Sequence, residues 1–313
     1  MDVKITNRTA KQPFLTRFKK EAVFHVMIWM GVAFVGVFNY LPMSGLIIAF
    51  KKYSFREGIW GSPWVGLANF RTLFSDFFMG NAVLNTVGIA LLSIAISYPA
   101  TIIFTLLLNE LANIKFKRVI QTVSYLPHFI SWAIMAVIMN IMLSPNDGIL
   151  NLLLRKTGVI DSPVAFLARE DLYWITVVLS SLWKNLGWNT IVYLAVISGI
   201  DEALYEAAKI DGATRIQRMR YITLPSLTGI ICIMLILSVG GITNTGFETS
   251  YFLSNTLNYA RSNTLSYYIY QIGLQRANFS YSTTISFLLS CISAAMMLGA
   301  NKLVNKINGR GLF

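Results

Sequence analysis

Long runs of apolar residues alternate with short polar connections along this chain of 313 residues. A helix that crosses a membrane needs about twenty mostly apolar residues, and six segments meet that requirement. They are Ala22–Phe50, Ala82–Leu108, Val119–Leu143, Tyr173–Ile200, Leu227–Leu253 and Thr284–Val304. Pro127 predicts a kink in the third segment, and Gly240 with Gly241 predicts a loosened helix in the fifth. The pattern therefore predicts an all-α polytopic membrane protein with six transmembrane helices.

The composition supports this fold class. Hydrophobic residues make up 55% of the chain and charged residues 13%, and the charged share is about half of the roughly 25% found in soluble domains. We expect one membrane domain at residues 22–307, between an N-terminal tail at residues 1–21 and a C-terminal tail at residues 308–313. The domain includes a polar loop at residues 201–225.

Basic residues are distributed unevenly between the two sides of the predicted spans. Because the number of spans is even, both tails lie on one side, together with the connections after the second and fourth spans. These parts carry sixteen Lys and Arg residues, against nine in the other three loops. The positive-inside rule therefore places both termini and residues 201–225 in the cytoplasm. This topology and anionic lipid headgroups explain the net charge of +12, so a nucleic-acid partner is not expected.

The loop at residues 201–225 has the local signals of two short helices joined by a turn. Asp201 can cap the first helix, because its side chain accepts a backbone N–H that has no partner within the helix. Gly212 suits the residue after that helix, where a positive φ is needed. Thr214 can cap a second helix, which we expect to end before Pro225. The pattern predicts a helix–turn–helix lying along the membrane surface.

The order of residues in this loop resembles the EAA loop of bacterial ABC-importer permeases. Glu206, Ala207 and Ala208 are followed by Gly212 and then by the sequence ITLP at residues 222–225. Other segments resemble the polysaccharide and oligosaccharide branch of the maltose-transporter-type permeases. They are GSPWVGLANF at residues 61–70, LNE at 108–110, YLPHF at 125–129, WKNLGWN at 183–189 and GFE at 246–248. The resemblance covers most of the chain.

This resemblance implies a type I ABC importer permease fold with cytoplasmic coupling helices. It implies a multi-pass subunit of the bacterial cell membrane that forms half of a translocation pathway for oligosaccharides or polysaccharide fragments. The implied partners are a second homologous permease, two ATP-binding subunits and an extracytoplasmic solute-binding protein. ATP and Mg²⁺ would be bound by the ATPase subunits, and the pathway would work by alternating access.

The resemblance also assigns roles to residues of the loop and of the neighbouring spans. The residues expected to couple to the ATPase are Glu206, Ala207, Ala208, Asp211, Gly212, Arg215, Ile222, Leu224 and Pro225. Polar and aromatic residues within a span are costly unless they face partners or a cavity, and two such clusters flank the loop. The residues expected to contact sugar are Lys184, Asn185, Gly187, Trp188, Asn189, Tyr193, Ser238, Asn244, Thr245 and Glu248. Hydrogen bonds between helices would explain individual members of these clusters equally well.

Lys184 and Glu248 are the two informative charges within the spans. A lone charge at the bilayer centre costs at least about 2.5–3.5 kcal/mol, so each needs water or a partner. They can pair with each other, face a hydrated cavity or contact a second permease. In a hydrated cavity, Lys184 would be a candidate contact for an acidic sugar.

The chain carries no sequence signal of an enzyme. It has no G-x-x-x-x-G-K-[ST] phosphate loop, no G-x-S-x-G elbow and no H-E-x-x-H helix, so we expect ATP hydrolysis on a separate subunit. His25 and His128 lack neighbouring ligand-type residues, so no metal site is expected.

Two alternative functions remain open at this point. An ion-coupled secondary sugar carrier would use an intramembrane carboxylate such as Glu248, but such carriers commonly have internal repeats and more spans. A structural or enzyme-anchoring membrane subunit would have no pathway at all. Neither alternative explains the coupling loop.

Overall fold

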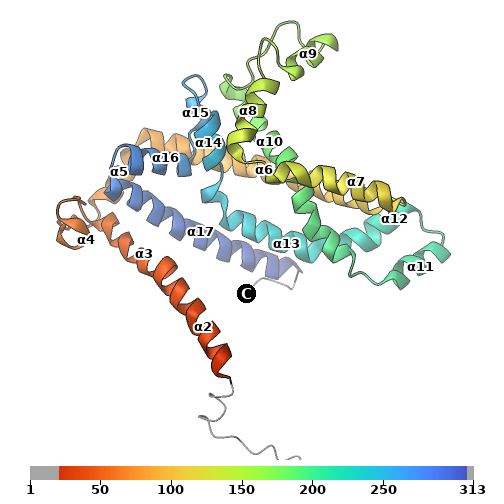
Figure 1. The fold of residues 1–313 in the computed structure, drawn as a ribbon, viewed down its shortest axis with the longest axis horizontal. Helices are drawn as coiled ribbons and strands as arrows, with labels where there is room; N and C mark the ends of the chain where they lie inside the picture. Colours follow the sequence, from red (N-terminus) through yellow and green to blue (C-terminus); the bar gives the residue numbers. More distant parts are fainter. Residues whose placement is uncertain (1–20, 309–313) are drawn as a thin grey trace, which may run out of the picture.

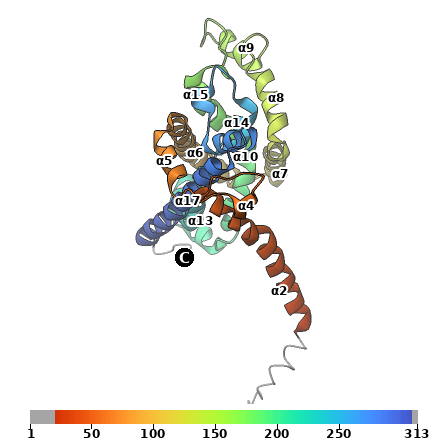
Figure 2. The same ribbon diagram turned by 90° about the vertical axis from the view of Figure 1, so that its left-hand side faces the viewer.

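The computed structural model describes residues 21–308, and within that range the protein is helical with no β-strand. Its long helices lie beside one another in an elongated bundle (Figures 1 and 2). The elements that correspond to the six predicted spans are the helical run from α2 (Ala22–Val35) to Phe50, α6 (Phe77–Asn109), α7 (Ile114–Tyr125) with α8 (Trp132–Met142), α10 (Glu170–Ile197), α12 (Arg215–Arg218) with α13 (Leu224–Gly240), and α17 (Phe279–Asn308). The first run includes α3 (Leu41–Met43).

Four of these helices in residues 21–308 are long and apolar enough to cross a membrane, or five if the bent α7–α8 pair counts as one span. The helix α10 has 28 residues, enough at about 1.5 Å per residue to cross as well. Polar side chains such as Lys184 and Asn189 lie in its middle. The predicted count of six spans is consistent with this arrangement.

The third predicted span is broken rather than continuous. The chain forms a tight 3₁₀ turn at Leu126–Phe129 after α7, and α8 then leaves at 104° to it. Pro127 removes a backbone donor at this turn, and the Ser131 side chain accepts the Ile134 N–H to start α8 anew. The kink expected at Pro127 is confirmed, and the segment predicted as one span at Val119–Leu143 consists of two helices joined by a sharp bend.

The fifth predicted span ends earlier than expected. The helix α13 ends at Gly240, and a short turn at Ile242–Asn244 and α14 (Phe247–Leu253) follow in its place. Gly246 lies between them with φ of 83°, a conformation that glycine adopts without steric cost. The helix was expected to be loosened or kinked at Gly240 and Gly241, and it ends there. A single helix at Leu227–Leu253 is wrong.

The helix that starts after the coupling turn runs on through Pro225. Residues Arg215–Gly240 form one helix of 26 residues, with a wide π-type turn at Met219–Thr223. A wide turn just before a proline accommodates its ring and its missing N–H. The expected helix end before Pro225 is therefore wrong.

Short helices cover the end of the bundle opposite the coupling helix α11 (Glu202–Ile210). The remaining elements are α4 (Gly58–Gly61), α5 (Ala68–Ser75), α9 (Ile149–Lys156), α15 (Tyr259–Ser262) and α16 (Leu265–Tyr270), the last followed by a wide turn at Gln271–Gln275. Figure 1 shows α4, α5 and α16 at this end and α11 and α12 at the other. The sequence predicts that these two ends lie on opposite sides of the membrane.

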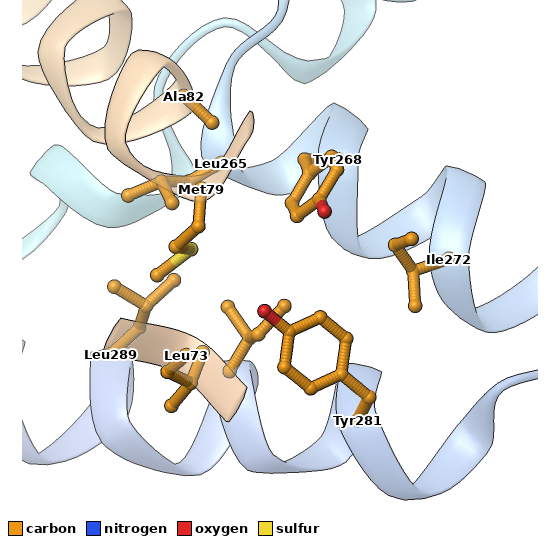
Figure 3. Close-up of a cluster of buried hydrophobic side chains, with 9 residues drawn as sticks. Leu73, Met79, Ala82, Leu265, Tyr268, Ile272, Tyr281 and Leu289 are labelled. Atoms are coloured by element: carbon orange, nitrogen blue, oxygen red, sulfur yellow. The ribbon is translucent and has the colours of Figure 1, made fainter. Parts of the chain in front are cut away.

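A half-buried carboxylate joins the elements of this end of the bundle. Asp76 caps α6 by accepting the N–H groups of Phe78 (2.9 Å) and Met79 (3.3 Å). Its other oxygen accepts the hydroxyl groups of Tyr268 on α16 (2.5 Å) and Tyr281 on α17 (2.6 Å). Figure 3 shows both tyrosines among the apolar side chains of this core. Asp76 therefore holds the start of α6 against α16 and α17.

We expect Tyr281→Phe to lower thermal stability in detergent, because a hydrogen bond to a charged group contributes about 1.5–3 kcal/mol. Burial raises the pKa of Asp76, but the hydrogen bonds from Tyr268, Tyr281 and the two amides together hold that pKa below its usual value. The stabilisation that the ionised Asp76 gains from these hydrogen bonds is therefore fully present above the pKa of Asp76 in the unfolded chain. It is lost as pH falls through the lower pKa of Asp76 in the folded protein. A thermal melt of wild type and variant across acidic pH checks this, and a difference between them that grows as pH falls would contradict it.

Candidate functional site

Three neighbouring cavities form a polar groove along α6, α10 and the break after α13. Their volumes are about 200, 300 and 240 Å³. The first two share Ser97, Tyr98 and Ser238, and the last two share Ser93 and Thr245. Ser93, Ser97 and the nearby Thr101 follow i, i+4 and i+8 on α6, so one face of this helix is polar. We call this continuous surface the polar groove.

Six of the residues expected to contact sugar line the polar groove. Asn189 and Tyr193 of α10 and Ser238 of α13 line its first cavity. Asn244, Thr245 and Glu248, at the break between α13 and α14, line its third. Their amide, hydroxyl and carboxylate groups face one connected space, which fits a ligand with many hydroxyl groups. Sugar contact at these residues stays a prediction.

The structure adds Tyr98 to the groove, a residue that the sequence analysis did not select. Its hydroxyl donates to the carbonyl of Met234 (2.7 Å) and also contacts the hydroxyl of Ser238. Tyr98 therefore connects α6 with α13 across the groove. The serine and threonine stripe of α6 was the available signal, but it lies within a long apolar run.

The other four predicted residues lie around the break between α7 and α8. The Nζ of Lys184 donates to the backbone carbonyl of His128 (2.5 Å). The His128 Nδ1 and the Asn185 Oδ1 are 3.0 Å apart, and the His128 ring stacks on Trp188 with ring centres 4.4 Å apart. These contacts satisfy backbone and side-chain groups where the helix is interrupted.

At Gly187 the helix α10 packs closely against α7. A Cβ atom at this position would lie 2.3 Å from the backbone oxygen of Ser124 and 2.4 Å from its carbonyl carbon. Only glycine allows the two helices to pack at this distance. The structure thus accounts for Gly187 by helix packing.

Lys184 and Glu248 do not form an ion pair. The Lys184 side chain is buried, with 7% of its surface exposed, and it is held by the broken helix. Glu248 is exposed and lines the third cavity of the groove. Of the three arrangements considered from the sequence, a direct salt bridge is therefore not formed, and Glu248 faces a cavity.

We expect Lys184→Met to lower the thermal stability of the chain and its uptake of neutral and acidic sugars alike. The reason is that the half-buried carbonyl of His128 loses its donor, which costs up to about 1–3 kcal/mol. The measurement is a melting curve together with uptake of a neutral and a uronic-acid oligosaccharide. A variant with normal stability and a selective loss of the acidic sugar would instead make Lys184 a ligand-binding residue.

The coupling loop has the caps expected from its sequence. The Asp201 side chain accepts the N–H of Ala203 at 3.0 Å, and Gly212 has a φ of 75°. Thr214 and Gln217 form a reciprocal capping box that starts α12. In addition, the hydroxyls of Tyr205 and Thr223 are 2.9 Å apart, so α11 is tied to the base of α13.

The loop exposes a mixed charged and apolar surface. Glu206, Asp211 and Arg215 are exposed, and Ile210 and Ile216 are 87% and 71% exposed. Ala207, Gly212, Leu224 and Pro225 are also exposed, whereas Ala208 and Ile222 are half-buried. An apolar surface of this kind beside charged side chains is compatible with the binding of another protein. Docking of an ATPase there stays a prediction.

The family model of the binding-protein-dependent transport system inner membrane component matches residues 97–307. This is more than half of the chain. The chain belongs to this family. The match includes the coupling loop and all parts of the polar groove except the Ile89–Ile94 portion of α6.

Two proteins of Bacillus subtilis are similar to this chain over nearly its whole length. The chain is 37% identical over 303 residues to the protein LplB of Bacillus subtilis, covering 96% of this chain and 94% of that one. It is 35% identical over 315 residues to the polygalacturonan/rhamnogalacturonan transport system permease protein YteP of the same organism, covering 100% and 97%. Relatives of this kind are permease subunits, so this permease is not itself an enzyme.

Solved structures confirm the type I ABC importer permease fold. A chain of a bacterial ABC transporter involved in the import of the acidic polysaccharide alginate superposes with a TM-score of 0.86 at 33% identity, covering 94% of this chain and 99% of that one. A second crystal structure of a bacterial alginate ABC transporter, in complex with an alginate pentasaccharide-bound periplasmic protein, gives a TM-score of 0.87 at 33% identity with coverages of 96% and 99%. The chain is therefore an integral, multi-pass membrane permease of the binding-protein-dependent class.

Proposed function

We propose that this chain forms half of the translocation pathway of an ATP-driven importer of oligosaccharides or polysaccharide fragments. The observation that carries this proposal is the likeness over 94% of the chain to a permease chain of an alginate importer. The relative YteP, named for polygalacturonan and rhamnogalacturonan transport, points to the same class of substrate. The polar groove supplies the amide, hydroxyl and carboxylate groups that such a ligand requires.

We propose a second permease as the direct partner within the membrane. The helix α2 extends away from the body of the molecule (Figures 1 and 2), and the apolar window of its span has no buried residue. Its side chains are apolar on all sides, including Phe24, Trp29 and Phe34, so it needs lipid or another helix around it. The polar groove is likewise only one side of a pathway, and a homologous permease would complete it.

The remaining partners are two ATP-binding subunits, which carry ATP and Mg²⁺, and an extracytoplasmic solute-binding protein. The exposed isoleucines, Glu206 and Arg215 of the coupling loop would contact the ATPase. The excess of basic residues places this loop and both termini in the cytoplasm of a bacterial cell. Most of the N-terminal tail and of the C-terminal tail lies outside the described residues, so the expected domain limits stay predictions.

The test is uptake by the complete transporter in proteoliposomes, with Asn189→Leu as the variant. Asn189 is exposed in the first cavity of the groove, so we expect a KM for the sugar raised about tenfold, which corresponds to about 1.4 kcal/mol. Basal ATP hydrolysis and thermal stability should stay as in wild type. Asn140→Leu is the matched control, because Asn140 is an exposed asparagine of α8 outside the groove. Equal uptake by wild type and Asn189→Leu would contradict the role of the groove.

A further inference from the structure

A separate cavity of about 310 Å³ lies beside the coupling helix, at the opposite end of the bundle from α4 and α16. None of its lining residues belongs to the polar groove. One wall consists of Asn109 at the end of α6 with Lys117 and Gln121 of α7, and the facing wall consists of Glu202 and Tyr205 of α11. The end of α10 and the residues just after it form a mostly apolar floor of Leu194, Ile197, Ser198 and Ile200. We call this space the inner cavity.

The chemistry of the inner cavity suits a sugar ring. Its walls offer two amides, a phenol hydroxyl, one ammonium and one carboxylate, and the two charged groups, Lys117 and Glu202, do not pair with each other. Such a set can donate to and accept from several hydroxyl groups at once. The apolar floor can contact the CH groups of a ring. A phosphate-bearing headgroup fits less well than a neutral sugar, because Glu202 would repel it. A uronic acid can bind only with its carboxylate turned toward Lys117, whose ammonium can donate to that group, and away from Glu202. The volume lies at the lower end of ligand pockets, roughly 300–1,000 Å³.

The position of the inner cavity connects ligand binding with movement of the loop. Its two walls belong to different parts of the protein, the α6–α7 connection and the coupling helix α11. The helix α11 is in turn tied to the base of α13 through the contact of Tyr205 with Thr223 (2.9 Å). A ligand that bridges Gln121 and Glu202 would hold α11 against α7 and oppose any displacement of the coupling loop.

We propose that the inner cavity is a cytoplasmic sugar site through which imported product slows the transport cycle. This inference rests on the proposed function, because it requires that the coupling loop moves during ATP hydrolysis. A sugar that has accumulated in the cytoplasm would bind between α7 and α11 and stabilise one position of the coupling helix. Import would then decline as the product accumulates.

The test uses the complete transporter in proteoliposomes whose ATPase subunits face the outer buffer and whose lumen contains the loaded binding protein. Galacturonic acid and galactose are added separately to the nucleotide side. We expect each added sugar to inhibit the stimulated ATP hydrolysis. Gln121→Leu should raise the concentration needed for half-inhibition about tenfold, equivalent to about 1.4 kcal/mol. Glu202→Gln should also raise the concentration needed for half-inhibition. Glu202 is exposed, so this second variant should fold even if Gln121→Leu does not. Thr122→Leu, at an exposed neighbour on α7 that does not line the cavity, should behave as wild type.

Four results would overturn this proposal. Stimulated hydrolysis that neither sugar inhibits would exclude the site while leaving the proposed importer function intact. Equal inhibition of wild type, Gln121→Leu and Glu202→Gln would place the sugar elsewhere. Inhibition that follows the anionic-lipid content of the vesicles rather than the sugar would assign the cavity to a lipid headgroup. Absence of stimulation by every loaded binding protein would contradict the proposed function itself, and this inference would fall with it.

Discussion

Glu206→Lys should abolish ATP hydrolysis that depends on the loaded binding protein and should abolish uptake, while the chain still inserts into the membrane. Glu206 is exposed on α11, next to the apolar surface of Ile210. Its carboxylate is available for charge-assisted hydrogen bonds to an ATPase, and a reversed charge at a protein interface is strongly unfavourable. Because the residue has no role in the packing of this chain, the effect should be confined to assembly and coupling.

The control for this prediction is Glu110→Lys. Glu110 lies at the end of α6 on the same expected side of the membrane but outside the coupling loop. Membrane insertion is followed by fractionation, assembly by co-purification of the ATPase subunits, and coupling by stimulated ATP hydrolysis. A Glu206→Lys transporter with normal uptake would rule out this surface as the coupling element.

Gly187→Ala should destabilise the chain strongly, although alanine adds only one methyl group. The new Cβ would meet backbone atoms of Ser124 at 2.3 and 2.4 Å, and backbone atoms cannot move aside as the end of a flexible side chain can. Overpacking of this kind costs about 1–3 kcal/mol, and occasionally more. We expect a lower melting temperature and reduced uptake, because α10 carries Asn189 and Tyr193 of the groove on the same helix.

Gly229→Ala is the matched control. Gly229 also lies within a span, on α13, but a Cβ atom there would have no neighbour within 4 Å. Alanine is favoured over glycine in helices by about 1 kcal/mol, so this variant should be as stable as wild type or more so. If Gly187→Ala melts at the wild-type temperature, the close approach of α7 and α10 is incorrect.

Local signals explain most of what the sequence predicted correctly. The caps at Asp201 and Thr214 and the positive φ of Gly212 depend on residues within a few positions of one another, so they were predicted from the order of residues alone. The end of the helix at Gly240 and Gly241 likewise depends on neighbouring residues, because two glycines in a row weaken a helix. The expected helix end before Pro225 failed because a wide turn at Met219–Thr223 accommodates the proline, and no local rule identified that turn.

Contacts between distant segments explain most of what could not be predicted. The contact of Lys184 with the carbonyl of His128 joins residues 56 positions apart. It exists only because α8 turns by 104° away from α7. Gly187 was selected as a possible sugar contact because it lies among polar residues, yet the backbone of Ser124 determines its role. Tyr98 was missed because it is a single hydroxyl-bearing residue in an apolar run. Only the fold brings it into contact with Ser238, which is 140 positions away in the sequence.

The most direct test of the proposed importer is sugar uptake in proteoliposomes that contain this chain, its neighbouring permease and the ATPase subunits. The solute-binding protein should be supplied with a panel of neutral and uronic-acid oligosaccharides. We predict uptake of at least one oligosaccharide that requires both ATP and the binding protein and that persists when an ionophore removes all ion gradients. Uptake that continues without ATP but collapses with the ionophore would contradict the account and identify an ion-coupled carrier.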